Sequence, residues 1–167
     1  LHYALSAVIR FSNNKNIDKE SVAIRLKLME TTLLPMILAN AETWTNLTKN
    51  NMTELENMQK YMLTSILQQK ITTCYQGMLS ETVVMAMESR IHKKKLMLLH
   101  KIIQLDKNRL MKQVFRGQLK YGFSRCWTSE VMEILEKYSI KQNFNEIEQL
   151  TKTEWKKIIY RKIMERL

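Results

Sequence analysis

The chain has 167 residues and a formal net charge of +11, which permits one domain or two small ones and suggests a polyanionic partner. Three glycines and one proline are too few for a sandwich or barrel of short strands. No apolar run approaches the roughly 20 residues that span a bilayer, so we expect no membrane partner. Twelve methionines among many Leu, Lys, Glu and Gln residues favour helices, and we predict an all-α fold, an irregular bundle of about six to seven helices.

The first predicted helices occupy the N-terminal third of the chain. Residues 1–11 carry apolar side chains at helical spacing, and residues 12–16 form a polar break. Asp18 is a candidate N-cap for a second helix, which Pro35 is expected to kink or end. The apolar face of this second helix consists of Val22, Leu26, Met29 and Leu33.

Two further helices are predicted in the middle of the chain. Asn51 and Glu54 have the spacing of a capping box, and the stripe that follows is Leu55, Met58, Met62 and Ile66. After an irregular segment over 68–77, a long helix is predicted from about Thr82 to Leu105. Its inward side chains are Met87, Ile91, Leu98, Ile102 and Leu105, and Arg90, Lys93, Lys94, Met97 and Lys101 fall on another face.

The C-terminal part of the chain is predicted to hold three more elements. Asp106 or Asn108 can cap a helix that contains Leu110, Met111, Val114 and Phe115 and stops near Gly117 or Gly122. A loop with aromatic and basic residues follows, and Thr128 or Ser129 begins the next helix. A second capping box, over 151–154, opens the last helix. The best candidate for a domain boundary lies over 117–128. The expected division is therefore a helical domain over 1–117 and a C-terminal helical extension over 118–167, with a single domain as the alternative.

The basic charge is concentrated in one segment. Between Arg90 and Arg125 there are eleven basic residues against the single acidic residue Asp106, which is a net charge of +10 in 36 residues. The remainder of the chain is close to neutral. Such a local concentration is typical of a surface that binds a polyanion.

The cysteine count and the N-terminal residues indicate a cellular compartment for the chain. Cys74 and Cys126 are too few for a disulfide framework, which favours a reducing, intracellular compartment, nuclear or cytoplasmic. We predict that both are small core residues, and we also assign Trp44 and Trp155 to the core. No signal peptide is recognisable. Because the chain begins at Leu1 rather than Met, we interpret it as part of a longer protein.

Several short motifs follow one another in a recognisable order. They are the apolar run Leu33–Leu38 with Glu42, Thr43 and Trp44; Leu55–Glu56 with Gln59 and Ser65–Leu67; Ser80–Glu81; Arg90–Leu96; and Trp127 with Lys137–Ile140. This order resembles the region after the catalytic core in reverse transcriptases of non-LTR (LINE-like) retrotransposons. The resemblance implies thumb-like and connector helices that hold a template–primer duplex.

The chain departs from that family's pattern at three turns. Ala39–Asn40 replaces a Tyr-Gly pair, Thr73–Cys74 replaces a Thr-Pro pair, and Val83–Ala86 replaces a connector with Gly and Pro. Without these turn residues, we expect the long helix to begin earlier than in the family.

We find no catalytic residues. Reverse transcription needs aspartates that hold two metal ions, commonly in a Tyr-x-Asp-Asp turn, and this chain has only Asp18 and Asp106, outside any such turn. His92 and His100 would stand roughly 12 Å apart along one helix, too far to share an ion. We therefore expect no enzymatic activity, metal or cofactor in this chain, although a longer parent could be an RNA-directed DNA polymerase.

The predicted function is binding to the phosphate backbone of RNA or an RNA/DNA duplex. Tyr121, Phe123 and Trp127 interleave with basic residues, as in surfaces that stack unpaired bases. The predicted interface is Arg90, Lys93, Lys94, Lys101, Lys112, Arg116, Lys120, Tyr121 and Arg125. Two alternatives stay open: a helical module whose Met-rich faces pack against an upstream polymerase domain or a second copy, and a decayed fragment whose charges only solvate a helix.

Overall fold

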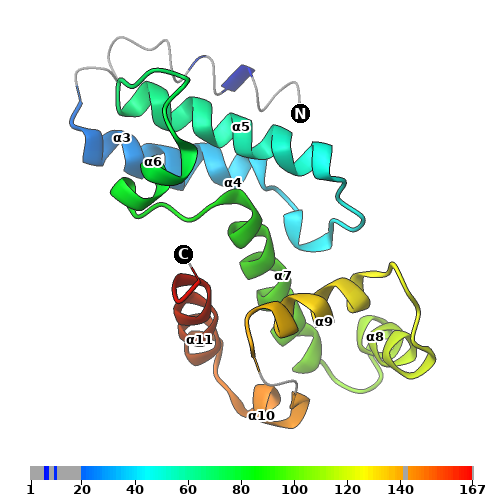
Figure 1. Cartoon of the computed structure of the whole chain (residues 1–167). Helices are drawn as coiled ribbons and strands as arrows, with labels where there is room; N and C mark the ends of the chain where they lie inside the picture. The colour runs from blue at the N-terminus through cyan, green and yellow to red at the C-terminus, as the bar shows by residue number, and fades with distance from the viewer. Residues whose placement is uncertain (1–5, 8–9, 11–19, 141–142, 167) are drawn as a thin grey trace. The chain divides into compact units, whose positions relative to one another are not determined.

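The computed structural model describes residues 6–7, 10, 20–140 and 143–166. Helices joined by short connections make up this part of the chain, and no strand occurs within it (Figure 1). The predicted all-α fold is therefore confirmed. Most of the helix predicted over 1–11, and the proposed N-cap Asp18, lie outside the described residues.

The chain divides into two compact units. Unit 1 comprises Leu1–Ala39 and Thr48–Glu88, and unit 2 comprises Asn40–Leu47 and Ser89–Leu167. The joint expected over 117–128 lies inside unit 2, and residues 117–121 of it are helical.

In unit 1, the helix over residues 22–37 is interrupted by a π-helical turn. Here α3 (Val22–Leu28), capped by the Ser21 side chain, leads into η1 (Met29–Leu33) and α4 (Leu34–Ile37). The backbone N–H of Leu34 donates to the Met29 carbonyl, five residues back, immediately before Pro35. Proline has no N–H to donate to a preceding carbonyl. The wider π-helical turn accommodates Pro35 within the helix, which ends two residues later at Ile37.

The core of unit 1 is built on α5 (Lys49–Ile66). The predicted stripe is buried in full, with Leu55, Met58, Met62 and Ile66 all at most 8% exposed. The helix begins before the predicted cap. Thr48 is the N-cap: its Oγ1 accepts from the Asn51 N–H at 3.2 Å, and the Asn51 side chain accepts from the Thr48 N–H at 3.1 Å. The predicted box at Asn51 and Glu54 was therefore wrong, because Thr48 and Asn51 form the capping box three residues earlier.

A connector separates α6 (Tyr75–Thr82) from α7 (Met87–Ile103), so the start of the long helix predicted near Thr82 was wrong. Val83 takes the left-handed conformation with φ 54°, although it is not glycine. Buried hydrogen bonds hold this break: Gln59 Nε2 donates to the Met85 carbonyl at 2.9 Å, and Tyr75 Oη donates to Gln59 Oε1 at 2.6 Å. An amide from α5 thus holds a connector that contains neither Gly nor Pro.

Unit 2 is organised around α7. It contains the 3-10 turn η2 (Ala41–Thr43), α8 (Leu110–Tyr121), α9 (Trp127–Lys137), α10 (Phe144–Gln149) and α11 (Lys152–Met164). Helices α9 and α11 both pack against α7 (Figure 1). Trp155 of α11 is 1% exposed, and its indole N–H donates to the Leu96 carbonyl at 2.9 Å. On the other side, the Tyr138 hydroxyl lies 3.0 Å from His92 Nδ1.

Two of the predicted tryptophans and the last predicted capping box lie in described parts of the chain. Trp155 is core as predicted, but Trp44 is only half-buried. The capping box of α11 is confirmed, since Thr151 accepts from the Glu154 N–H and Glu154 accepts from the Thr151 N–H. Hydrogen bonds from the Thr151 side chain and backbone hold the pKa of Glu154 below its usual value.

A glycine inside α8 and the glycine at its C-cap predict opposite effects on stability. Gly117 lies inside the helix with nothing within 4 Å of an added Cβ, so Gly117→Ala is expected to raise the free energy of unfolding by about 0.5–1 kcal/mol. Gly122 is the C-cap with φ 62°, so Gly122→Ala should lower it by about 1 kcal/mol. Urea unfolding of both variants measures these changes. If the free energy of unfolding changes in the same direction in both variants, the prediction is contradicted.

Candidate nucleic-acid interface

The basic residues predicted on α7 share one face of the helix. At about 100° per residue, Arg90, Lys93, Lys94 and Lys101 fall within an arc of about 100°. None of the four is buried, whereas Ile91, Leu96, Leu99 and Ile102, on other faces, are buried. The structure therefore places these four cationic side chains on one side of α7.

The four side chains differ in their partners. Lys94 forms an ion pair with Glu42, with 3.3 Å between Nζ and Oε2. The Lys93 ammonium lies 5.4 Å from the ring centroid of Tyr160 on α11. Lys101 is exposed and, within the described part of the chain, has no ion-pair partner. Part of this face is therefore engaged within the protein.

Lys112 does not belong to the interface. It is 6% exposed, and its ammonium donates to the carbonyls of Ile103 and Leu105, the latter at 2.7 Å. It also lies 3.1 Å from Glu148 Oε1. Its donors satisfy carbonyls at the C-terminal end of α7, which have no partner in the helix, and this role leaves none for a phosphate. No sequence pattern indicates this role, because the spacing of Lys112 resembles that of its exposed neighbours.

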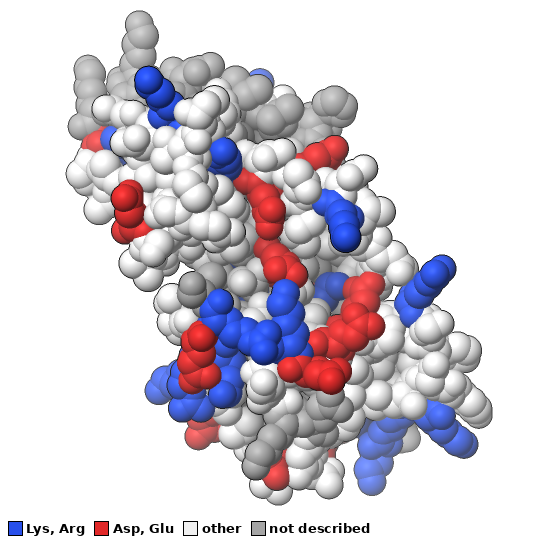
Figure 2. Space-filling model, in the orientation of Figure 1, with Lys and Arg blue, Asp and Glu red and all other residues white. Residues whose placement is uncertain are grey.

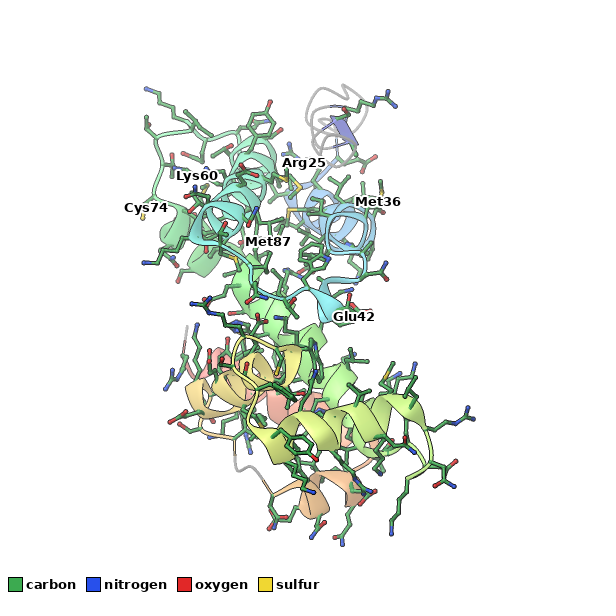
Figure 3. All side chains as sticks on the ribbon, turned by 90° about the vertical axis from the view of Figure 1, so that its right-hand side faces the viewer. Arg25, Met36, Glu42, Lys60, Cys74 and Met87 are labelled. Atoms are coloured by element: carbon green, nitrogen blue, oxygen red, sulfur yellow. The ribbon has the colours of Figure 1, made fainter. Side chains whose placement is uncertain are left out.

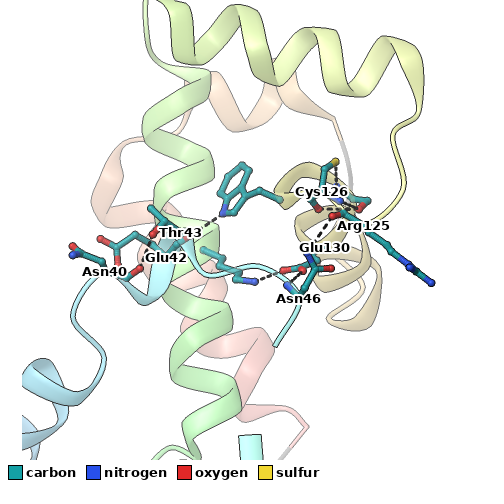
Figure 4. Close-up of polar contacts among 10 residues, drawn as sticks. Asn40, Glu42, Thr43, Asn46, Arg125, Cys126 and Glu130 are labelled. Atoms are coloured by element: carbon teal, nitrogen blue, oxygen red, sulfur yellow. Dashed lines mark hydrogen bonds and ion pairs between the residues drawn. The ribbon is translucent and has the colours of Figure 1, made fainter. Parts of the chain in front are cut away.

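Lys95 is a second internal cation. It is 4% exposed and pairs with Glu130 of α9, which also accepts from the backbone N–H of Asn46 (Figure 4). Trp127, at the start of α9, donates its indole N–H to the Glu42 carbonyl at 2.7 Å in the same region. Its ring also makes an edge contact with Phe115. These groups fix the 40–47 segment against α7 and α9, so Trp127 is an anchor within unit 2 rather than an open stacking surface.

The most open basic surface lies on α8 and its flanks. Arg109, Arg116 and Lys120 are spaced by seven and four residues, which puts them on one side of the helix. These three, with Lys107 and Arg125, are all exposed. No acidic residue occurs from Lys107 to Arg125, and none of the five pairs with an acid among the described residues. Lys107 and Arg109 were not in the predicted interface, although the spacing of Arg109 from Arg116 could have indicated it.

An apolar stripe lies beside this basic face of α8. Of the apolar residues predicted in this helix, only Phe115 is buried, while Leu110 is 74% exposed, Met111 53% and Val114 49%. Tyr121 and Phe123 continue the apolar surface at 70% and 58% exposed. Helix α8 runs across the lower front of Figure 3, with side chains projecting from it on several sides. The helix thus presents a packed, a basic and an apolar side.

The basic residues of α11 differ from those of α8 in their surroundings. Figure 2 shows Lys and Arg side chains gathered over the region of α7 and α11, with acidic side chains directly beside them. Lys162 lies 3.0 Å and Arg161 3.8 Å from carboxylate oxygens of Glu165. This charge is therefore partly compensated within the protein, in contrast to the basic side of α8.

Neither cysteine is a core residue, so that prediction was wrong. Cys74 is exposed at the N-cap of α6, and Cys126 is half-buried at the N-cap of α9, where its sulfur accepts from the Ser129 N–H. Cys126 suits its cap position because a small side chain with a lone pair can accept from the open N–H groups there. Within the described residues, no group of three or more His, Cys, Asp or Glu side chains could hold a metal ion.

None of the helices in the described part of the chain has both the length and the apolar composition to cross a membrane. No protein-family model matches the sequence, and no curated protein or solved structure matches it significantly.

The internal role of Lys112 predicts a stability effect that its exposed neighbours lack. Lys112→Ala is expected to lower the free energy of unfolding by about 2–3 kcal/mol, because carbonyls at the end of α7 lose a charged donor. Lys101→Ala, at an exposed position, should change it by less than about 0.5 kcal/mol. Urea titration measures both, and similar values for the two would refute the internal role.

The position of Cys74 predicts its reactivity. The backbone amides of Gly77 and Gln76 at the start of α6 lower the pKa of the Cys74 thiol, and Lys60, also marked in Figure 3, adds a smaller effect in the same direction. In a Cys126→Ser variant, alkylation by iodoacetamide should therefore accelerate at lower pH in the native chain than in urea. If the midpoint pH of the alkylation rate is equal or higher in the native chain than in urea, the prediction is contradicted.

Proposed function

We propose that this chain binds the phosphate backbone of RNA or of an RNA/DNA duplex, and that α8 with its flanking residues provides the principal contact. One observation carries the proposal: five exposed basic side chains, from Lys107 to Arg125, with no acidic residue among them and no acidic partner within the described chain. Ordinary solvated helix faces mix both signs of charge. An uncompensated cluster attracts polyanions strongly.

The geometry of α8 suits a nucleic-acid backbone. Arg109 and Lys120 lie eleven residues apart, which at 1.5 Å per residue is roughly 16 Å along the helix. This length matches several consecutive phosphates of one strand. Contacts of this kind release counterions, so the affinity they give is high at low salt and nearly independent of sequence.

The α7 face is a secondary contact. Lys101 is open to solvent, while Lys94 would have to leave Glu42 to reach a phosphate. The Lys94 and Glu42 side chains are 38% and 33% exposed, and such partly exposed pairs contribute only about 0–1 kcal/mol. A phosphate can therefore compete for Lys94, whereas it cannot compete for the buried Lys112.

The proposal fits the resemblance of the motif order to the post-catalytic region of retrotransposon reverse transcriptases. In that interpretation this chain holds nucleic acid and carries out no reaction. Polymerisation would belong to a part of a longer parent protein. An intracellular location, nuclear or cytoplasmic, follows from the proposed partner.

A second candidate function is protein interaction. It is favoured by the exposed apolar stripe of Leu110, Met111 and Val114, since exposed contiguous apolar surface often marks an interface. An upstream polymerase domain or a second copy of the chain would be the partner. The two candidates differ in salt response, because apolar contacts do not weaken as salt rises.

Charge reversal on α8 tests the proposed function. Fluorescence anisotropy with a labelled single-stranded RNA and an RNA/DNA duplex should show affinity that falls steeply from low salt to about 0.15 M. Arg116→Glu/Lys120→Glu should bind far more weakly, with the slope of log K against log salt reduced by about 0.7 for each lost contact on the single strand.

The matched control carries the same change in net charge elsewhere. Lys27→Glu/Lys70→Glu alters two exposed lysines of unit 1 and is expected to leave most of the binding intact. If both double variants bind as the unaltered chain does, or lose affinity equally, α8 is not the contact.

A further inference from the structure

Two aromatic rings at the end of α8 are exposed without a structural reason. Tyr121 is 70% exposed and Phe123 is 58% exposed, on either side of the left-handed Gly122. Large aromatic side chains usually bury their surface, because each carries a large apolar area. The buried aromatic rings of unit 2 are instead those of Phe115, Tyr138 and Trp155.

The two rings do not cover each other. Their centroids are 6.2 Å apart and their planes are inclined by 53°, so they do not form a parallel stack. The Lys120 ammonium lies 5.4 Å from the centroid of the Tyr121 ring, yet most of the Tyr121 side chain remains accessible. Each ring therefore has surface on which another planar group can stack.

The charged residues nearest the rings in the sequence are all basic. Arg116 and Lys120 precede them on α8, and Arg125 follows in the loop, all three exposed and without an acidic partner in the described chain. A ligand at this end must therefore combine planar apolar groups with repeated negative charge. An unpaired nucleic-acid strand has this composition, since its bases are free to stack and its phosphates repeat along the chain.

We propose that Tyr121 and Phe123 stack on unpaired bases while Arg116, Lys120 and Arg125 contact the adjoining phosphates. This end of α8 thereby prefers single-stranded nucleic acid over a duplex. The inference rests on the proposed function and adds a substrate class to it. In a duplex the base faces are already stacked on their neighbours, so the rings would have no partner.

An acidic protein helix is the competing occupant, and the chemistry favours the strand. The aromatic pair lies within four residues of Lys120 and Arg125, at the end where α8 stops. A partner helix would instead be expected to follow the full length of the stripe that begins at Leu110. Stacking needs only the two rings and the charges beside them.

Base removal tests the inference separately from the backbone contact. The whole chain is titrated with three labelled probes in one buffer: an oligothymidylate of about 12 nucleotides, an abasic strand with the same number of phosphates, and a duplex of the same length. The unaltered chain should bind the thymidylate strand at least about fivefold more tightly than the abasic strand. It should also prefer that strand to the duplex.

Ring variants locate the effect. Tyr121→Ala/Phe123→Ala should abolish the preference for bases and leave affinity for the abasic strand unchanged, because the phosphate contacts remain. Tyr121→Phe/Phe123→Tyr, which keeps both rings, should retain the preference. Circular dichroism of both variants should match that of the unaltered chain, because the two side chains are exposed.

Each outcome decides between the claims. Equal, salt-dependent binding of thymidylate and abasic strands by the unaltered chain overturns the stacking inference while the proposed function stands. No binding of any probe overturns both. If the alanine variant keeps its preference for bases but loses self-association in sedimentation, the rings belong to a protein interface, and the inference fails.

Discussion

The contact of Lys112 with the end of α7 decides what unit 2 presents to solvent. Its ammonium bonds the carbonyls of Ile103 and Leu105, so the side of α8 that bears Lys112 must face inward. With about 100° between successive residues, the rotation of the whole helix is then fixed. Arg116 and Lys120 consequently point outward on one side, and Leu110 and Val114 on another. One buried cation thus produces both the basic and the apolar surface.

The lysines of this segment have different roles according to how deeply they are buried. Lys95 and Lys112 are buried and bonded to acids or carbonyls, where loss of the partner would leave an uncompensated charge. Lys94 has a partner near the surface and exchanges it at small cost. Lys120 has no acidic partner in the described chain, and it is available to a ligand. The net charge of the segment therefore overstates the charge that a polyanion meets.

Buried polar contacts also replace turn residues in this chain. The connector before α7 has no glycine or proline, and Val83 adopts a left-handed conformation that glycine would take more easily. Gln59 fixes the connector by donating to the Met85 carbonyl, and Tyr75 in turn orients Gln59. The break between α6 and α7 therefore depends on contacts from α5 rather than on local chain stiffness.

The sequence by itself determined the helical class, the buried stripe of α5, the capping box at Thr151 and the single basic face of α7. Each of these follows from spacing within one helix, which the period of 3.6 residues makes readable. Only the tertiary structure decided the direction in which each face points. The burial of Lys112, the exposure of Leu110 and Tyr121 and the capping positions of the cysteines depend on partners distant in sequence or on the ends of helices. A periodic pattern identifies a face, but the neighbouring helix determines whether that face meets protein or water.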